Sequence, residues 1–120
     1  MLLSINPAHV EYILNGTKRF EFRKVRSRRA VRSILIYSTA PVRQVVGEAE
    51  VVGTVYGSPE EVWDRTYGYS GITKQFFDEY YCGHQRAIAY ELGEISVYEA
   101  PKSLDDLGVR CAPQSFVYVS

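Results

Sequence analysis

The order of predicted elements indicates an α+β protein, mainly β, in which short helices pack at the ends of a small antiparallel or mixed barrel. Apolar runs typical of strands outnumber the helical patterns along the chain. The helical patterns are short, and few could serve as crossover helices in a parallel sheet. With 120 residues, 46% of them hydrophobic and 23% charged, we expect one globular domain over residues 1–120.

The first predicted elements are a short helix and a strand. In residues 4–16, Pro7 lies in the first helical turn, and Gly16 suits the left-handed position after the helix. Residues 19–23, RFEFR, alternate strictly, so we expect the two phenylalanines to face the core and the charged side chains to face away. The glycine turn before this strand is expected to place Lys18 at the mouth of the structure.

The middle of the chain predicts two strands after a basic connection. Residues 34–38 form a continuous apolar run typical of a buried strand. Residues 45–57 predict a long strand that is bent or bulged at Gly47 or Gly53.

Two helices and several strands are predicted in the second half. Ser58 can cap a helix and Glu61 can complete a capping box. A second short helix is expected between Thr73 and Gly83. Beyond it the pattern predicts two strands in residues 86–100 around a turn at Gly93, then a helical turn and a final strand at residues 115–119.

Positive charge is concentrated in one segment. The chain carries 14 Lys and Arg against 14 Asp and Glu, yet eight of these cations lie between positions 18 and 32. A concentrated basic patch is typical of proteins with a phosphate-bearing partner. The alternative is a solvated basic loop whose charge is offset by the acidic second half of the chain.

Several classes of protein are disfavoured. The two cysteines lie far apart and form no CxxC pair, which argues against a zinc knuckle and fits reduced thiols. The N-terminus does not resemble a signal peptide, and no run approaches the about 18 apolar residues of a membrane span. We therefore expect a cytoplasmic protein without a membrane partner, and nothing in the sequence calls for a metal or an organic cofactor.

One motif gathers chemically useful side chains. GTKRFEFR has the form G-x-K-x-x-E-x-R, with Gly16, Lys18, Glu21 and Arg23 at the named positions. Glu21 and Arg23 lie two residues apart and share one face of the predicted strand. Arginine can bind a phosphate or a base edge, and glutamate can accept from an exocyclic amine. The alternative is a surface ion-pair ladder worth less than about 1 kcal/mol.

This motif, following a short helix, resembles the signature of ASCH domains in the PUA-like superfamily. The similarity to the stand-alone archaeal and bacterial branch extends to four further segments: ILIYSTAPVRQVVGEAEV, GSPEEVWDRT, SGITKQFFDEYY and PQSFVYVS. The resemblance implies a PUA-like small β-barrel with short flanking helices and a cleft lined by the motif. It also implies binding of RNA or of a modified nucleotide, as a regulator in translation or transcription.

The family that this chain resembles also includes enzymes. A small amidohydrolase of this type removes acyl groups from modified cytidine with a lysine that aligns with Lys18, and its arginine aligns with Arg23. Its threonine nucleophile falls where this chain has Glu21, so Lys18 and Glu21 are catalytic candidates only for a Lys-Glu acid/base mechanism. The later glutamate of that enzyme could correspond to Glu60, Glu61 or Glu79. Another relative is a ribonuclease.

Further candidate ligand-binding residues come from loops and strand ends. Arg26, Arg28, Arg29 and Arg32 could follow a nucleic-acid backbone. The remaining candidates are Tyr37, Ser38, Thr39, Tyr67, Tyr69, Gln114 and Ser115. Turn chemistry explains Ser38 and Thr39 equally well, and most of the tyrosines are expected in the core or half-buried on strands. His9 and His84 are expected at the surface, and Trp63 in the core.

Three functions follow as hypotheses. The first is a module that binds RNA or a modified nucleoside. The second is a hydrolase of the ASCH type, an amidohydrolase or a ribonuclease. The third is an oligomerising domain in which the basic half of one chain pairs with the acidic half of another. The specific ligand and the oligomeric state are left open.

Overall fold

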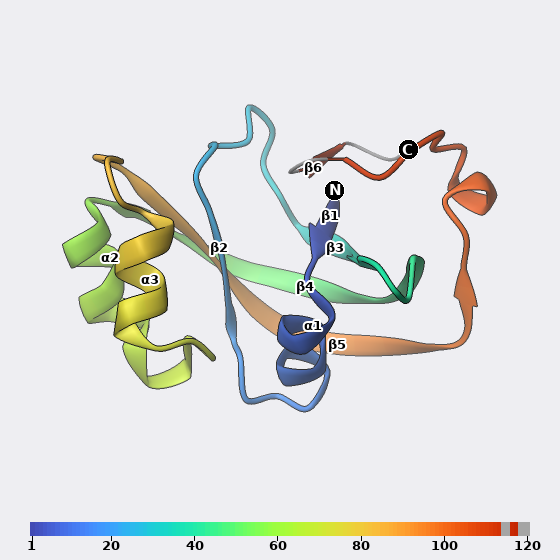
Figure 1. Ribbon diagram of the computed structural model, residues 1–120, viewed down its shortest axis with the longest axis horizontal. Coiled ribbons are helices and arrows are strands. Elements are labelled where there is room, and N and C mark those ends of the chain that lie inside the picture. The colour runs from blue at the N-terminus through green and yellow to red at the C-terminus, as the bar shows by residue number, and fades with distance from the viewer. Residues whose placement is uncertain (114–115, 118–120) are drawn as a thin grey trace.

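Six strands form one mixed sheet in the computed structural model, which describes residues 1–113 and 116–117 (Figure 1). The strands are β1 (Leu2–Ile5), β2 (Phe20–Arg23), β3 (Ser33–Ser38), β4 (Gln44–Gly57), β5 (Ala87–Lys102) and β6 (Phe116–Val117). Their order across the sheet is β2-β5-β4-β3-β1-β6. β1 and β3 are parallel, and the other neighbours are antiparallel.

The α+β class, mainly β, is therefore confirmed, whereas the closed barrel is not. The strand order begins at β2 and ends at β6, and no pairing among the described residues joins these two ends. β1 was not predicted, because a run of four residues is too short to show a period of its own.

The two longest strands, β4 and β5, run together along most of their lengths. Their pairing shifts register near Gly47 and near Gly53, which confirms the predicted bulges. The predicted turn at Gly93 was wrong, since β5 is continuous from Ala87 to Lys102. A Cβ atom at Gly93 would lie 2.6 Å from Cγ1 of Val52, so this glycine permits a close approach between strands.

Three short α-helices begin at the predicted capping residues or beside them. α1 (Pro7–Leu14) is capped by the side chain of Asn6, α2 (Pro59–Thr66) by the predicted capping box of Ser58, and α3 (Lys74–Tyr80) by Thr73. Two 3₁₀ turns, η1 (Tyr67–Tyr69) and η2 (Asp105–Leu107), complete the helical elements. α2 and α3 lie together at one end of the sheet, and α1 lies near its middle (Figure 1). None of the described helices is long and apolar enough to span a membrane.

Two hydrophobic clusters form most of the core. One joins α1 to β1, β3 and the middle of the long strands. The other packs α2 and α3 against β2, β4 and β5, with Phe77 at its centre. Phe77 is 1% exposed, and its ring contacts those of Phe22, Trp63 and Tyr81. The phenylalanines of β2, Phe20 and Phe22, both belong to this second cluster, which therefore anchors the strand.

Replacing Phe77 should therefore destabilise the protein far more than replacing its neighbour Phe76. We expect Phe77→Ala to lower the free energy of unfolding by about 3–5 kcal/mol, because it leaves a cavity among three aromatic rings. Phe76 is 44% exposed, and Phe76→Ala should cost about 1 kcal/mol. Urea denaturation of the two variants checks this, and equal losses would contradict the assignment of Phe77 to the core.

Candidate functional site

A pocket of about 170 Å³ lies between β1, α1, β2 and α3, and the motif lines it. Lys18 and Glu21 contribute to its wall together with Phe22 and Arg23. β1 and the start of α1 contribute polar groups from Ser4, Asn6 and His9, and α3 contributes Phe76 and Tyr80. The pocket therefore combines opposite charges with an aromatic wall, as small-molecule sites do.

Glu21 and Arg23 form a buried ion pair on one face of β2. They are 5% and 8% exposed. Arg23 donates to Oε2 of Glu21 from Nε at 3.0 Å and from Nη2 at 2.6 Å, and Nη2 also donates to the carbonyl oxygen of Ser4 at 2.9 Å. Within the described residues, Oε1 of Glu21 accepts no hydrogen bond, so it keeps its capacity to accept one from a ligand.

The sequence predicted Lys18 at the mouth of the structure, but the structure places it inside. It is 2% exposed, and its Nζ donates to the carbonyl oxygen of Ser70 at 2.7 Å. The Nζ atom also lies 4.8 Å from the ring centroid of Phe22. Gly71 (φ +69°) packs so closely that a Cβ atom there would lie 2.5 Å from Cβ of Lys18. The backbone of residues 70–71 thus covers the lysine.

Burial lowers the pKa of Lys18, and the positive charge of Arg23 adds to this effect while Glu21 opposes it. A lysine with a lowered pKa is neutral over a wider pH range and can then act as a base. The pKa of His9 is also lowered, mainly by burial and secondly by the positive charge of Lys18. The pocket therefore contains two basic side chains, the amine of Lys18 and the imidazole of His9, beside the carboxylate of Glu21.

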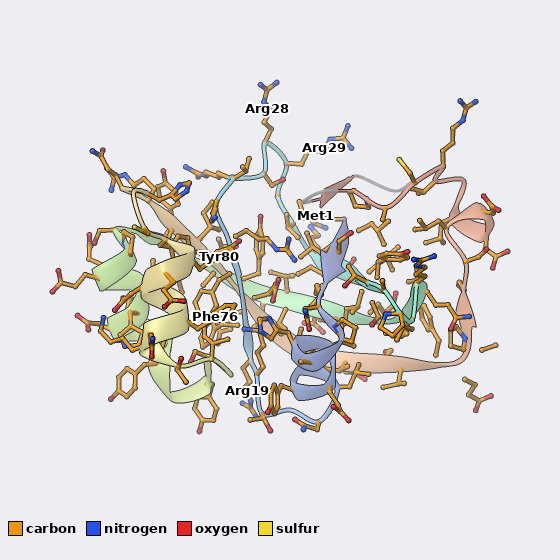
Figure 2. All side chains as sticks on the ribbon, in the orientation of Figure 1. Met1, Arg19, Arg28, Arg29, Phe76 and Tyr80 are labelled. Atoms are coloured by element: carbon orange, nitrogen blue, oxygen red, sulfur yellow. The ribbon has the colours of Figure 1, made fainter. Side chains whose placement is uncertain are left out.

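Three residues of the aromatic and basic wall were not among the predicted site residues. The ring of His9 contacts Phe76 edge-on at 5.3 Å, and Figure 2 shows Phe76 and Tyr80 on the side of α3 nearest β2. The spacing along the helices could have indicated these residues, because side chains four positions apart lie on the same helix face. His9 lies four residues before the buried Ile13, and Phe76 lies four residues before Tyr80. His9 was expected to be an isolated surface residue, but it is half-buried and lines the pocket.

The predicted basic residues after β2 lie outside this pocket. Arg26, Arg28, Arg29 and Arg32 are exposed, and Arg28 and Arg29 project from the tip of the connection to β3 (Figure 2). Arg26, Arg28 and Arg29 line a second hollow of about 390 Å³ together with Thr54, Tyr56 and Tyr90. The basic segment thus divides into buried residues in the pocket and exposed residues beyond it.

The structure does not bring the other predicted ligand-binding residues to the pocket. Tyr37 and Ser38 are buried in β3, where Tyr37 packs with Leu2 and Val45, and Thr39 is half-buried after that strand. Tyr67 and Tyr69 are exposed. The guanidinium carbon of Arg19 lies 5.2 Å from the ring centroid of Tyr69.

The predicted residues Gln114 and Ser115 lie outside the described residues.

The candidate acid groups of an amidohydrolase also lie elsewhere. Glu60, Glu61 and Glu79 are exposed, and none of them lines the pocket. The side chain of Glu61 accepts a hydrogen bond from the backbone of Ser58 in the capping box of α2. In the described part of the chain, no group of three or more His, Cys, Asp or Glu side chains could hold a metal ion.

Comparison with known proteins identifies relatives that cover this site. A family model described as the ASCH domain matches residues 3–99. An "ASCH domain-containing ribonuclease" from Zymomonas mobilis is 30% identical over 107 residues, which are 88% of this chain and 72% of the relative. The crystal structure of ASCH from Zymomonas mobilis superposes with a TM-score of 0.89 at 28% identity and covers 99% of this chain and 86% of the other.

Other relatives are longer proteins from Ureaplasma parvum. An ATP synthase subunit alpha is 28% identical over 120 residues, and a large ribosomal subunit protein uL22 is 27% identical over 120 residues. The chain spans only 15% and 39% of the lengths of these two proteins.

Replacing Lys18 by methionine should change how stability depends on pH. Because the pKa of Lys18 is lower in the folded state, the unfolded chain binds more protons between that value and the ordinary lysine pKa. The unfolding free energy of the wild type should therefore rise with pH in this alkaline range relative to Lys18→Met. The difference between the two proteins removes the contribution of Tyr81, whose pKa is raised by burial in both.

Urea denaturation at a series of alkaline pH values measures this difference. A difference that stays constant with pH, or that falls as pH rises, would contradict the buried state of the Lys18 amine.

Proposed function

The chain belongs to the ASCH domain family, and on that premise we propose that its pocket binds RNA through one nucleotide, or binds a modified nucleoside. The ion pair of Glu21 and Arg23 inside the pocket carries this proposal. Oε2 of Glu21 is occupied by Arg23, which leaves Oε1 to accept from the exocyclic amine of a base. The rings of Phe22, Phe76 and Tyr80 provide apolar faces against which a base can pack.

The name of the Zymomonas relative supports RNA as the ligand class, because that protein is named a ribonuclease. The exposed arginines at the connection between β2 and β3 are consistent with a polyanionic ligand. The carboxylate in the pocket favours bases that carry an amine over bases that carry a carbonyl at the same position.

Glu21→Gln should invert this base preference. Both hydrogen bonds that Arg23 donates to Glu21 go to one oxygen, so a glutamine would turn its carbonyl oxygen to Arg23 and place its amide NH₂ where Oε1 lies. Wild type should bind cytidine about tenfold more tightly than uridine, and the variant should prefer uridine, whose O4 accepts from the amide. Calorimetry with both nucleosides at low salt measures the preference.

Glu79→Gln is the matched control, because this glutamate is exposed on α3 and lies outside the pocket. It should leave the preference for cytidine unchanged. No measurable binding of nucleosides or of a mixed RNA pool at low salt would overturn the proposed function. The same base preference in wild type and Glu21→Gln would remove Glu21 from the site.

A second candidate function, RNA cleavage, is favoured by the lowered pKa of Lys18. We propose that the neutral amine accepts the proton of a ribose 2′-hydroxyl while the 2′-oxygen attacks the adjacent phosphorus. The bond from phosphorus to the 5′-oxygen breaks, and that oxygen leaves with a proton from solvent or from a protonated His9. The products are a 2′,3′-cyclic phosphate and a 5′-hydroxyl end, and the guanidinium of Arg23 stabilises the negative charge of the transition state.

Lys18→Met should separate cleavage from binding. Methionine fills nearly the same space but cannot accept a proton, so cleavage of end-labelled RNA should slow by about a hundredfold or more. Affinity for uncleavable 2′-deoxy RNA analogues should fall much less. Lys74→Met, which removes an exposed lysine of α3, should leave the rate unchanged.

Equal cleavage by wild type and Lys18→Met would contradict a catalytic role for this lysine. RNA binding by the wild type without cleavage would leave the pocket as a binding site, in keeping with the regulatory role that the sequence resemblance implies.

A further inference from the structure

The segment that connects α2 to α3 packs on the motif of β2. Two of its backbone carbonyl groups accept hydrogen bonds from consecutive motif residues. The carbonyl oxygen of Ser70 accepts from Nζ of Lys18 at 2.7 Å, and that of Tyr69 accepts from the backbone N–H of Arg19 at 2.8 Å. We call residues 67–72 the cover segment, because Lys18 lies beneath it.

The hydroxyl of Ser70 fastens the cover segment from inside. Its Oγ can donate to the carbonyl oxygen of Tyr67 at 3.2 Å or to that of Ile72 at 3.0 Å, and it accepts from the backbone N–H of Ile72 at 3.4 Å. Ser70 is 2% exposed, so water does not compete for these bonds. One side chain thus joins the two ends of the segment and fixes the carbonyl that Lys18 contacts.

The next residue of the cover segment packs on the alkyl chain of the lysine. A Cβ atom at Gly71 would lie 2.5 Å from Cβ and 2.7 Å from Cγ of Lys18. The backbone of Gly71 also has a positive φ of +69°, which favours glycine. A small displacement of the segment would therefore change both the space above Lys18 and the place of its hydrogen-bond acceptor.

The cover segment contributes to the burial of the amine without adding a charge. Glu21 and Arg23 act on Lys18 from β2, His9 interacts with it from α1, and Tyr80 of α3 lines the same pocket. The cover segment carries no charged side chain, and both of its tyrosines are exposed. Burial lowers the pKa of Lys18 more than any other cause. The position of the segment should therefore affect how easily the amine is protonated.

Turn formation alone does not account for this arrangement. Serine side chains in turns commonly bond to nearby backbone groups, which would explain the contacts of the Ser70 hydroxyl. It would not explain why the carbonyl of the same residue accepts from a buried amine, or why the following glycine packs on the chain that carries this amine. Both contacts connect the turn to Lys18.

We infer that Ser70 is a positioning residue for Lys18: its hydroxyl fixes the cover segment, which orients the amine and keeps water from it. The inference deepens the proposed RNA cleavage and rests on it for its catalytic consequence. When the amine is neutral, one N–H is held by the carbonyl of Ser70, so the lone pair points away from that carbonyl and can accept a proton. Ser70 itself need not touch the substrate.

The protonation of Lys18 can be followed directly by NMR, without any substrate. The chain has four lysines, so ¹³C labelling of lysine gives few ε-carbon signals, and Lys18→Met identifies the signal of Lys18. In Ser70→Ala the pH midpoint of this signal should rise by about one pH unit toward the ordinary lysine value, because water then reaches the amine. Ser70→Thr keeps the hydroxyl and should keep the wild-type midpoint.

Thr66→Val is the matched control. Thr66 is also 2% exposed, and its Oγ1 donates to the carbonyl oxygen of Val62 within α2 at 2.8 Å. This variant loses a buried hydrogen bond that does not fasten the cover segment, so the midpoint of Lys18 should stay unchanged. Circular dichroism checks that each variant is folded.

A second variant tests the same segment from its exposed side. Tyr69 is 58% exposed, and its ring lies against the guanidinium of Arg19, so Tyr69→Ala should loosen the segment without opening the core. The midpoint of Lys18 should rise in this variant too, by less than in Ser70→Ala. If Ser70→Ala does not fold, Tyr69→Ala decides the question, and an unchanged midpoint overturns the inference.

The pH dependence of RNA cleavage gives the catalytic test. Only the neutral amine accepts a proton, so the rate should rise with pH up to the pKa of Lys18. With this pKa about one unit higher, Ser70→Ala should cleave about tenfold more slowly than wild type at neutral pH, and the difference should shrink at alkaline pH. A residue that only stabilises the fold would lower the rate by the same factor at every pH.

The two measurements separate the inference from the proposed function. If the midpoint of Lys18 is the same in wild type and Ser70→Ala, the positioning role is overturned even when RNA is cleaved. If wild type does not cleave RNA but the midpoint rises in Ser70→Ala, the proposed cleavage fails and the control of the amine by Ser70 stands. A rise in Thr66→Val as large as in Ser70→Ala, or a loss of rate that is equal at every pH, overturns the positioning role.

Discussion

The ion pair of Glu21 and Arg23 is the constraint on which the rest of the site depends. Two charges are withdrawn from water on one short strand, and removing either would leave the other buried without compensation. The same guanidinium also reaches the backbone of Ser4, so it links β2 to β1, which are not neighbours in the sheet. A polar interaction therefore spans the pocket between two strands that no backbone ladder joins.

Most of the fold could be predicted because its local signals agree with its tertiary structure. The caps at Ser58 and Thr73 and the early Pro7 depend on residues close in sequence, and the glycines themselves marked the bulges near Gly47 and Gly53. The errors arose where distant contacts decide. Gly93 resembles a turn residue, but contact with Val52 across the sheet determines its role, and β1 exists only through its pairing with β3 and β6.

The site was only partly accessible to prediction for the same reason. Strand alternation brought Glu21 and Arg23 to one face, and the structure places Lys18 in the same pocket. Sequence alone could not reveal that Lys18 is covered by the segment around Ser70, or that α1 and α3 contribute His9, Phe76 and Tyr80. Tyr37 and Ser38 looked like ligand contacts because they end a strand, yet both are buried in it.

The close contact of Gly71 with Lys18 has a consequence for comparing members of this family. The backbone at residues 70–71, which lies more than 50 positions after Lys18, sets how far the amine is shielded from water. Chains with an identical G-x-K-x-x-E-x-R string can therefore carry lysines of different basicity when this distant loop differs. Grouping such proteins by the loop as well as by the string would separate lysines that are neutral often enough to accept a proton from lysines that stay charged and only bind.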